Sequence, residues 1–118
     1  MSLTASVRQL GAVTVIDLNG RVTLGDATGL LRETVQKAAE GSSAILLNLA
    51  GVSYMDSAGL GEMVGAHASV TNRGGKVKLL HVQKRLHDLL QITRLYTLFE
   101  TFDDEAAAVM SFTQSAKA

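Results

Sequence analysis

The chain has 118 residues, with 11 Lys and Arg against 11 Asp and Glu, and it contains no Cys, Pro or Trp. That length suits one compact domain, and a hydrophobic share of 47% against 19% charged residues is too apolar for a disordered chain. The absence of Cys excludes a disulfide framework, thiol catalysis and a Cys-zinc site. A net charge of zero argues against a nucleic-acid-binding surface and against a polybasic membrane patch.

Membrane insertion and secretion are not indicated either. The apolar runs are far shorter than the ~20 residues that a membrane helix needs. The start of the chain, Met1-Ser2-Leu3-Thr4, lacks the basic residues and the apolar run of a secretory signal. We therefore expect a small, soluble, cytoplasmic domain.

The first elements are predicted to form a β-hairpin. The segment from Val13 to Leu18 mixes β-branched and apolar residues and stops at Asn19-Gly20, which predicts a strand that ends in a turn there. A weaker, alternating strand is expected from Leu3 to Leu10, and Gly11 can turn it back onto its neighbour.

A helix and a buried strand are predicted next. Asp26 is a candidate N-cap for the helix, and Gly41 is expected to end it in the left-handed conformation. Apolar positions recur there at three- and four-residue spacing. The strand from Ala44 to Leu49 is nearly continuous in apolar character, which is typical of a strand covered on both faces in the middle of a sheet. A turn is expected from Gly51.

The second half of the chain continues the alternation of helices and strands. A helix is predicted from about Ala58 to Asn72, ended by Gly74-Gly75, with an inward face drawn from Leu60, Met63, Val64, His67 or Ala68, and Val70 or Thr71. The later elements are a strand over Lys76–Val82, a helix over Arg85–Leu95, a strand over Phe99–Phe102 and a helix after Asp103-Asp104-Glu105. Only Thr113 to Ala118 is expected to be loose.

The order β-β-α-β-α-β-α-β-α gives the fold class. Strands that alternate with short helices indicate an α/β domain with a mixed, mostly parallel sheet and right-handed crossovers. We expect about five strands and about four helices in a single domain over residues 1–118.

The segment from Gly51 to Gly61 is the candidate site, because sites in such sheets gather at the carboxyl ends of strands. Its Asp56-Ser57 pair has two interpretations. One of the two residues is the N-cap of the following helix, or the hydroxyl of Ser57 is exposed and modified.

The sequence motifs of common enzyme sites are absent from this segment. A nucleophile elbow needs Gly two places before its Ser, and that place holds Met55. A dinucleotide fingerprint fails because Gly65 comes one place late after Gly59 and Gly61, and no P-loop is present. We expect the glycines to let the helix start close to the sheet.

Other reactive side chains have simpler explanations. His67, His81 and His87 have no metal-ligand spacing, and His81 and His87 are expected to straddle a strand-to-helix junction. His67 is interpreted as a partly buried packing residue. The basic residues of the third predicted helix are interpreted as a solvated face: Lys84, Arg85 and Arg94.

The segment from Leu47 to Gly61 closely resembles the signature of STAS-domain anti-sigma factor antagonists. Leu18 to Val22 is similar to the second strand and turn of that family. The likeness continues through Gly74-Gly75, Val77–Leu80, Val82–Leu95 and Phe99–Phe102, so it covers nearly the whole chain.

The resemblance implies a STAS fold and a binding protein that is not an enzyme. We expect no cofactor, and we expect no metal because the histidines lack metal-ligand spacing. The resemblance also implies that the chain binds an anti-sigma factor, which is also its serine kinase, and so frees a sigma factor. The kinase would phosphorylate Ser57, and a serine phosphatase would reverse this. Asp56 would act as a cap or in kinase recognition. The implied partner-binding residues are Thr23, Gly25, Met55, Asp56, Ser57, Ala58, Gly59 and Leu60.

Several positions depart from the family's pattern, among them Ala58, Thr23 and Lys84. Ala58 stands where several relatives carry a second Ser or Thr, so Ser57 is the only hydroxyl candidate in the block. Thr23 stands where many relatives have an acidic residue, and Asp26 could supply that charge or cap the helix. The alternative function is a STAS scaffold, or a subunit of a larger signalling or transport assembly. We expect a monomer, or a weak homodimer formed through exposed Met55 or Leu60.

Overall fold

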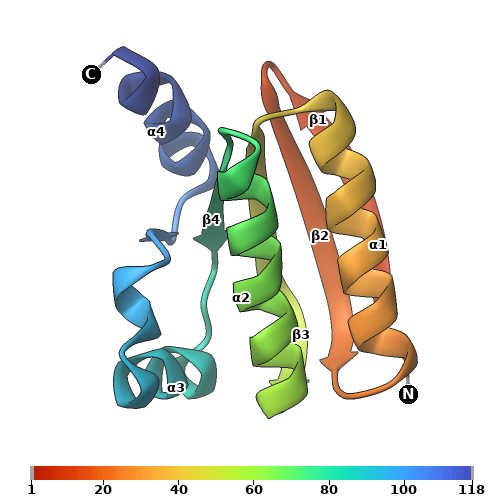
Figure 1. Ribbon diagram of the computed structural model, residues 1–118. Coiled ribbons are helices and arrows are strands. Elements are labelled where there is room, and N and C mark those ends of the chain that lie inside the picture. Colours follow the sequence, from red (N-terminus) through yellow and green to blue (C-terminus); the bar gives the residue numbers. More distant parts are fainter. Residues whose placement is uncertain (1, 118) are drawn as a thin grey trace.

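A five-stranded sheet between helices forms the body of the protein (Figure 1). This computed structural model describes residues 2–117, with the side chains of residues 2–113. The elements are β1 (Thr4–Leu10), β2 (Val13–Val22), α1 (Asp26–Gly41), β3 (Ala44–Met55), α2 (Ser57–Asn72), β4 (Lys76–Leu80), α3 (Lys84–Thr93), the short 3₁₀ helix η1 (Leu95–Thr97), β5 (Thr101–Phe102) and α4 (Glu105–Lys117). Apart from η1, this is the predicted order, and the α/β fold class is confirmed.

The sheet has the strand order β1-β2-β3-β4-β5. β1 and β2 pair antiparallel, as the predicted hairpin requires, and Gly11 in the turn has a positive φ of 61°. The pairs β2–β3, β3–β4 and β4–β5 are parallel. The carboxyl ends of β2, β3 and β4 therefore lie at the same edge, where the loops that follow them meet.

Two apolar cores lie on opposite faces of the sheet. The larger one packs α1, α2 and α3 against the first face and includes Ile16, Leu31, Leu47, Met63 and Leu79, all fully buried. The smaller one packs Ala108 and Phe112 of α4 against Val13, Val15, Leu46 and Leu80. β3 contributes to both cores, so the prediction of a central strand covered on both faces is confirmed.

β2 and β3 are longer than predicted, and the turns expected at Asn19-Gly20 and at Gly51 are wrong. Both strands continue side by side as far as the pair Val22 and Met55, with two shifts of register on the way. A Cβ at Gly51 would overlap the side chain of Asn19, and Gly20 has a φ of 117°. These glycines therefore permit a close, irregular strand pairing that side chains would block.

Two details at the ends of α1 also differ from the predictions. Asp26 is the first helical residue, and the N-cap is Gly25, with a φ of 119°. The hydroxyl of Thr28 donates to the Gly25 carbonyl (2.9 Å). Gly41 is the last helical residue and is not left-handed, because extended Ser42 ends the helix.

The C-terminal helix extends further than any element we predicted there. α4 continues to Lys117, through most of the segment from 113 to 118 that we expected to be loose. Ala118 lies outside the described residues.

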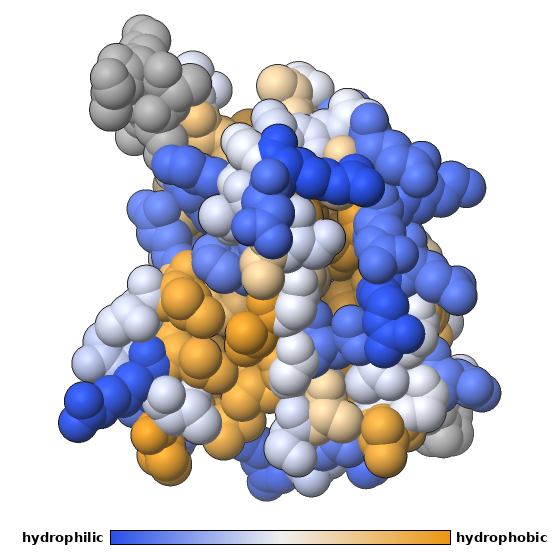
Figure 2. Space-filling view, viewed as in Figure 1, coloured by the Kyte–Doolittle hydropathy of each residue, from blue (hydrophilic) through white to orange (hydrophobic). Residues whose placement is uncertain are grey.

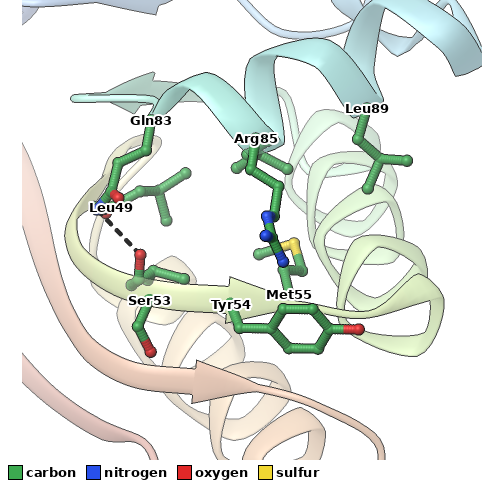
Figure 3. A pocket seen from close by; sticks show the side chains of 9 residues that line it. Leu49, Ser53, Tyr54, Met55, Gln83, Arg85 and Leu89 are labelled. Atoms are coloured by element: carbon green, nitrogen blue, oxygen red, sulfur yellow. Dashed lines mark hydrogen bonds between the residues drawn. The ribbon is translucent and has the colours of Figure 1, made fainter.

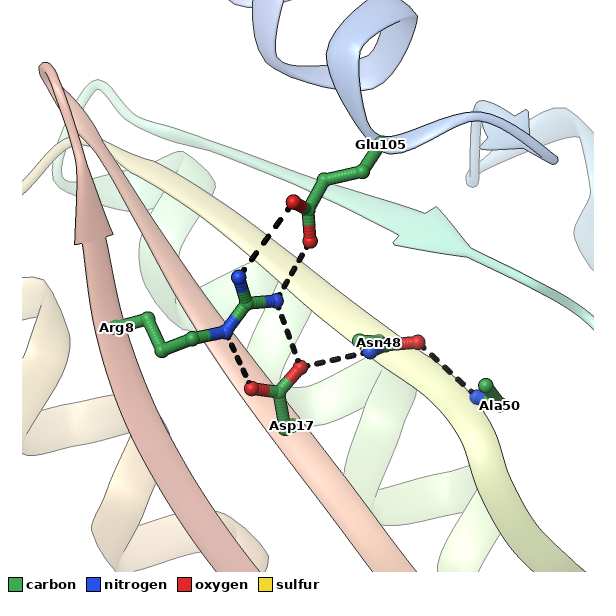
Figure 4. Close-up of polar contacts among 5 residues, drawn as sticks. All are labelled: Arg8, Asp17, Asn48, Ala50 and Glu105. Atoms are coloured by element: carbon green, nitrogen blue, oxygen red, sulfur yellow. Dashed lines mark hydrogen bonds and ion pairs between the residues drawn. The ribbon is translucent and has the colours of Figure 1, made fainter.

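A polar cluster joins β1, β2, β3 and the start of α4 (Figure 4). The guanidinium of Arg8 donates to Asp17 (Nη2 to Oδ1, 3.0 Å) and to Glu105 (Nη2 to Oε1, 2.6 Å). Asn48 donates to Asp17 (2.7 Å) and accepts from the backbone N–H of Ala50 (3.1 Å). The Arg8 hydrogen bond, followed by that of Asn48, lowers the pKa of Asp17. The cluster thus ties the edge hairpin to α4.

The face that carries α1 and α2 is unevenly polar (Figure 2). Hydrophilic side chains cover the outer side of α1, whereas apolar side chains gather between α2 and the α3–η1 segment. Half-buried Val64, Leu89 and Leu95 pack there against the core, and Leu98 is 38% exposed. Within residues 2–117, none of the helices has the length and apolar character needed to cross a membrane.

Candidate functional site

The loops after β2 and β3 meet at one edge of the sheet. Val22 and Met55 end the paired region of the two strands, and the backbone N–H of Asp56 donates to the Val22 carbonyl (3.3 Å). The loop from 23 to 25 then leads to α1, and Asp56 leads directly into α2. The site therefore combines two segments about 30 residues apart in sequence, held together by parallel strand pairing.

Asp56 is the N-cap of α2. Its Oδ1 accepts from the backbone N–H of Gly59 (2.8 Å), and its Oδ2 accepts from the backbone N–H of Leu24 in the neighbouring loop (3.1 Å). The first of the two predicted interpretations of the Asp56-Ser57 pair is confirmed, with Asp56 as the cap. These hydrogen bonds, that of Gly59 first, lower the pKa of Asp56, because they favour its charged form.

Ser57 is the first residue of α2, one place earlier than the predicted start, and it is exposed. Its hydroxyl forms no hydrogen bond within the part of the chain that the structure describes. The N-terminus of a helix presents free backbone N–H groups and a partial positive charge. The helix N-terminus would therefore offset part of the charge of an anionic group on Ser57, which would lie beside the charged carboxylate of Asp56.

Gly59 sets how closely α2 approaches the sheet. A Cβ at this position would overlap the carbonyl oxygen of Val22 and lie 2.9 Å from Cγ of Met55. The prediction that glycine lets the helix start near the sheet is confirmed at Gly59. It is wrong at Gly61, where a Cβ would meet no atom within 4 Å.

Some of the other predicted partner-binding residues are buried, and others are half-buried or exposed. Met55 is 8% exposed and Leu60 is 7% exposed, and both belong to the larger core, so the expectation that they are exposed for self-association is wrong. Their burial follows from the close seat of α2 on β2. Thr23 and Ala58 are half-buried, and Gly25 is exposed.

Leu24 is the apolar side chain that this edge presents to solvent, with 79% of its surface exposed. Our sequence reasoning missed it. The available signal was an apolar residue between Thr23 and Gly25 in a loop that the core does not use.

A second group of side chains lies at the end of β3 (Figure 3). The side chain of Gln83, just before α3, donates to the carbonyls of Ala50 (2.7 Å) and Val52 (2.9 Å). Arg85 of α3 reaches over the ring of Tyr54, with its Cζ 5.8 Å from the ring centroid. The prediction of a solvated face is confirmed, because Lys84, Arg85 and Arg94 are all exposed. The contact of Arg85 with Tyr54 was not predicted.

The three histidines lie at separate places in the fold. His67 is half-buried as expected and packs edge-on against Phe99, with ring centroids 5.3 Å apart. His81 follows β4 and His87 lies in α3, so they straddle a strand-to-helix junction as predicted. Among the described residues, no group of three or more His, Cys, Asp or Glu side chains could hold a metal ion.

Residues 4–108 match the STAS domain family. The chain is 33% identical to an anti-sigma-B factor antagonist of Bacillus subtilis over 100 residues, which is 85% of this chain and 91% of that protein. It shares the fold of the Bacillus cell fate determinant SpoIIAA in the phosphorylated form (TM-score 0.72, 21% identity, 92% of this chain and 98% of that one). It also shares the fold of a sulfate transporter family protein from Wolinella succinogenes (TM-score 0.78, 19% identity, 92% and 91%).

Proposed function

The chain belongs to the STAS domain family, and on that premise we propose that it is an anti-sigma factor antagonist, a cytoplasmic binding module and not an enzyme. Its unphosphorylated form binds an anti-sigma factor with serine kinase activity, and this frees a sigma factor. Phosphorylation of Ser57 ends the binding, and a serine phosphatase restores it. The observation that carries the proposal is the exposed Ser57 directly after the fixed cap Asp56.

Phosphorylation at this position changes the surface without unfolding the domain. A phosphate adds about −1.5 to −2 charges and three acceptor oxygens. The helix N-terminus accommodates this anion, so the effect falls on a partner that had packed closely against Ser57. A loss of ~3 kcal/mol of binding free energy corresponds to a roughly hundredfold weaker affinity, which is enough for a switch.

The burial of the site residues suggests how the interface is built. Exposed Ser57 and Leu24, with Thr23, Gly25 and Ala58, form the surface that the partner would cover. Met55, Gly59 and Leu60 support that surface from beneath. The similarity to the Bacillus subtilis anti-sigma-B factor antagonist supports an anti-sigma factor as the partner.

The test uses purified histidine-kinase-like anti-sigma proteins encoded in the same genome. Calorimetric titration should show binding by the wild type and Ser57→Ala, and binding roughly a hundredfold weaker by Ser57→Glu. Mass spectrometry after incubation with ATP should find phosphate on Ser57. Ser43→Ala, which changes an exposed serine at the other end of β3, is the matched control and should be phosphorylated normally.

Equal binding by the Ser57 variants, or phosphate on another residue, would contradict the proposal. An unmodified Ser57 together with self-association in light scattering would favour the alternative of a STAS scaffold or a subunit of a larger assembly.

A further inference from the structure

We infer that Arg21, Tyr54 and Arg85 form a second docking site, which binds an acidic segment of the anti-sigma factor next to Ser57. This inference rests on the proposed function. It concerns a surface that neither the predicted site residues nor the comparisons include.

Two guanidinium groups converge on one aromatic ring. Arg21 of β2 and Tyr54 of β3 are register partners, and Cζ of Arg21 lies 4.9 Å from the ring centroid. Cζ of Arg85, which comes from α3, lies 5.8 Å from the same centroid. Both distances are within the range of cation–π attraction, so both positive charges lie close to the same ring.

These cations have no carboxylate partner within residues 2–113. By contrast, Arg8 pairs with Asp17 and Glu105, and Arg32 pairs with Glu62. Arg21 and Arg85 are both exposed, and each offers several N–H donors in a planar arrangement that fits a carboxylate. Adjacent carboxylates on a partner would meet this requirement.

A small apolar pocket lies beside the ring and distinguishes a peptide from a free anion. Its volume is about 40 Å³, and its apolar walls are Leu49, Val52, Met55, Leu86 and Leu89. Ligand pockets for small molecules measure roughly 300–1,000 Å³, so this one accepts only the end of an aliphatic side chain. An acidic segment that also carries an aliphatic residue fits both parts of the surface.

The backbone beneath this surface is fixed before a partner arrives. The side-chain NH2 of Gln83 donates to the carbonyls of Ala50 and Val52, with the Leu49 carbonyl a further 3.4 Å contact, and so holds α3 to the irregular end of β3. Ordering of the backbone therefore contributes little to the free-energy cost of binding, and the cost that remains is that of ordering the two exposed arginine side chains.

The position of Tyr54 connects this surface to the switch. It lies three residues before Ser57, and at the rise of an extended strand this separation is roughly 10 Å. One protein interface of ordinary size covers both. The acidic segment would thus hold the partner beside the hydroxyl that it phosphorylates.

The experiment compares five variants by titration with the same purified anti-sigma protein. Arg21→Gln and Arg85→Gln should each raise Kd roughly threefold, and the double variant roughly tenfold, with a weaker dependence of binding on salt. Arg85→Lys should retain much of that salt dependence. Arg73→Gln is the matched control, because Arg73 is an exposed arginine at the far end of α2 and should leave Kd unchanged.

The outcomes separate the two proposals. If the Arg21 and Arg85 variants bind like the wild type while Ser57→Glu loses binding, the docking site is wrong and the proposed function stands. If the wild type binds none of the anti-sigma proteins, the proposed function fails and the docking site with it. Equal losses in the Arg73 control and the Arg85 variant would also overturn the docking site, because they would show a nonspecific effect of charge.

Discussion

The carboxylate of Asp56 accepts a hydrogen bond from the backbone N–H of Leu24, 32 residues earlier in the chain, at 3.1 Å. The same carboxylate caps α2 through Gly59. The side chain of Asp56 therefore fixes both the start of α2, where Ser57 lies, and the loop that presents Leu24. The two exposed parts of the proposed partner surface are positioned by a common anchor.

Removing this anchor should destabilise the domain. We expect Asp56→Ala to lower the melting temperature by about 5 °C, because the Gly59 and Leu24 N–H groups lose their acceptor. Asp56→Asn keeps an acceptor oxygen and should lose less. Asp26→Ala is the control: Asp26 is the first residue of α1 but not its cap, so its change should be smaller. Thermal unfolding followed by circular dichroism measures all three, and equal shifts for Asp26 and Asp56 would contradict the role of Asp56.

Acid should weaken the fold through lowered carboxyl pKa values. The pKa of Asp56 is lowered by the Gly59 and Leu24 hydrogen bonds, and the pKa of Asp17 is lowered by its hydrogen bond with Arg8. In the unfolded chain these carboxyl groups titrate near pH ~4. Their stabilisation is therefore present above that pH and is lost as the pH falls through the lower folded-state values.

The midpoint of urea unfolding, measured between neutral pH and about pH 3, should fall on acidification. The fall should be smaller in Asp56→Asn, which cannot titrate at this position. An identical pH dependence of the two proteins would show that Asp56 does not contribute to it.

The close packing of α2 on the sheet should not tolerate one added methyl group at Gly59. Gly59→Ala would place Cβ against the backbone carbonyl of Val22, which cannot move aside, and should cost about 2–3 kcal/mol of the free energy of unfolding. Gly61→Ala in the same turn meets open space and should stabilise the helix by up to about 1 kcal/mol. Chemical denaturation of both variants is the measurement. A tolerated alanine at residue 59 would show that the close approach is dispensable.

The sequence was sufficient for features that local chemistry determines. Apolar periodicity predicted the order of strands and helices, and the Asp56-Ser57 pair marked the cap of α2. Asn19-Gly20 and Gly51 led to wrong predictions of turns, because turn propensity describes only the local chain. In the structure β2 and β3 pair through these residues and use the space left by the missing side chains of the glycines. Tertiary packing overrode the local preference there.

The composition of the surface around the site could not be predicted from local sequence patterns. Arg21, Tyr54 and Arg85 come from three separate elements, and only the parallel pairing of β2 with β3 and the seat of α3 bring them together. The burial of Met55 at the end of β3 likewise depends on how closely α2 packs on the sheet. Neither follows from residue spacing.

Leu24 should contribute to partner binding without contributing to the fold. Its side chain is 79% exposed, so its loss should leave the melting temperature nearly unchanged, whereas its burial under a partner would remove a large apolar surface from water. We expect Leu24→Ser to weaken binding of the anti-sigma protein roughly tenfold, as for a central apolar contact. Ile92 of α3 is also 79% exposed, and Ile92→Ser is the matched control for the removal of surface apolar area. Calorimetric titration separates them: a loss confined to Leu24 places the interface at the loop that Asp56 holds, and equal losses, or none, would place it elsewhere.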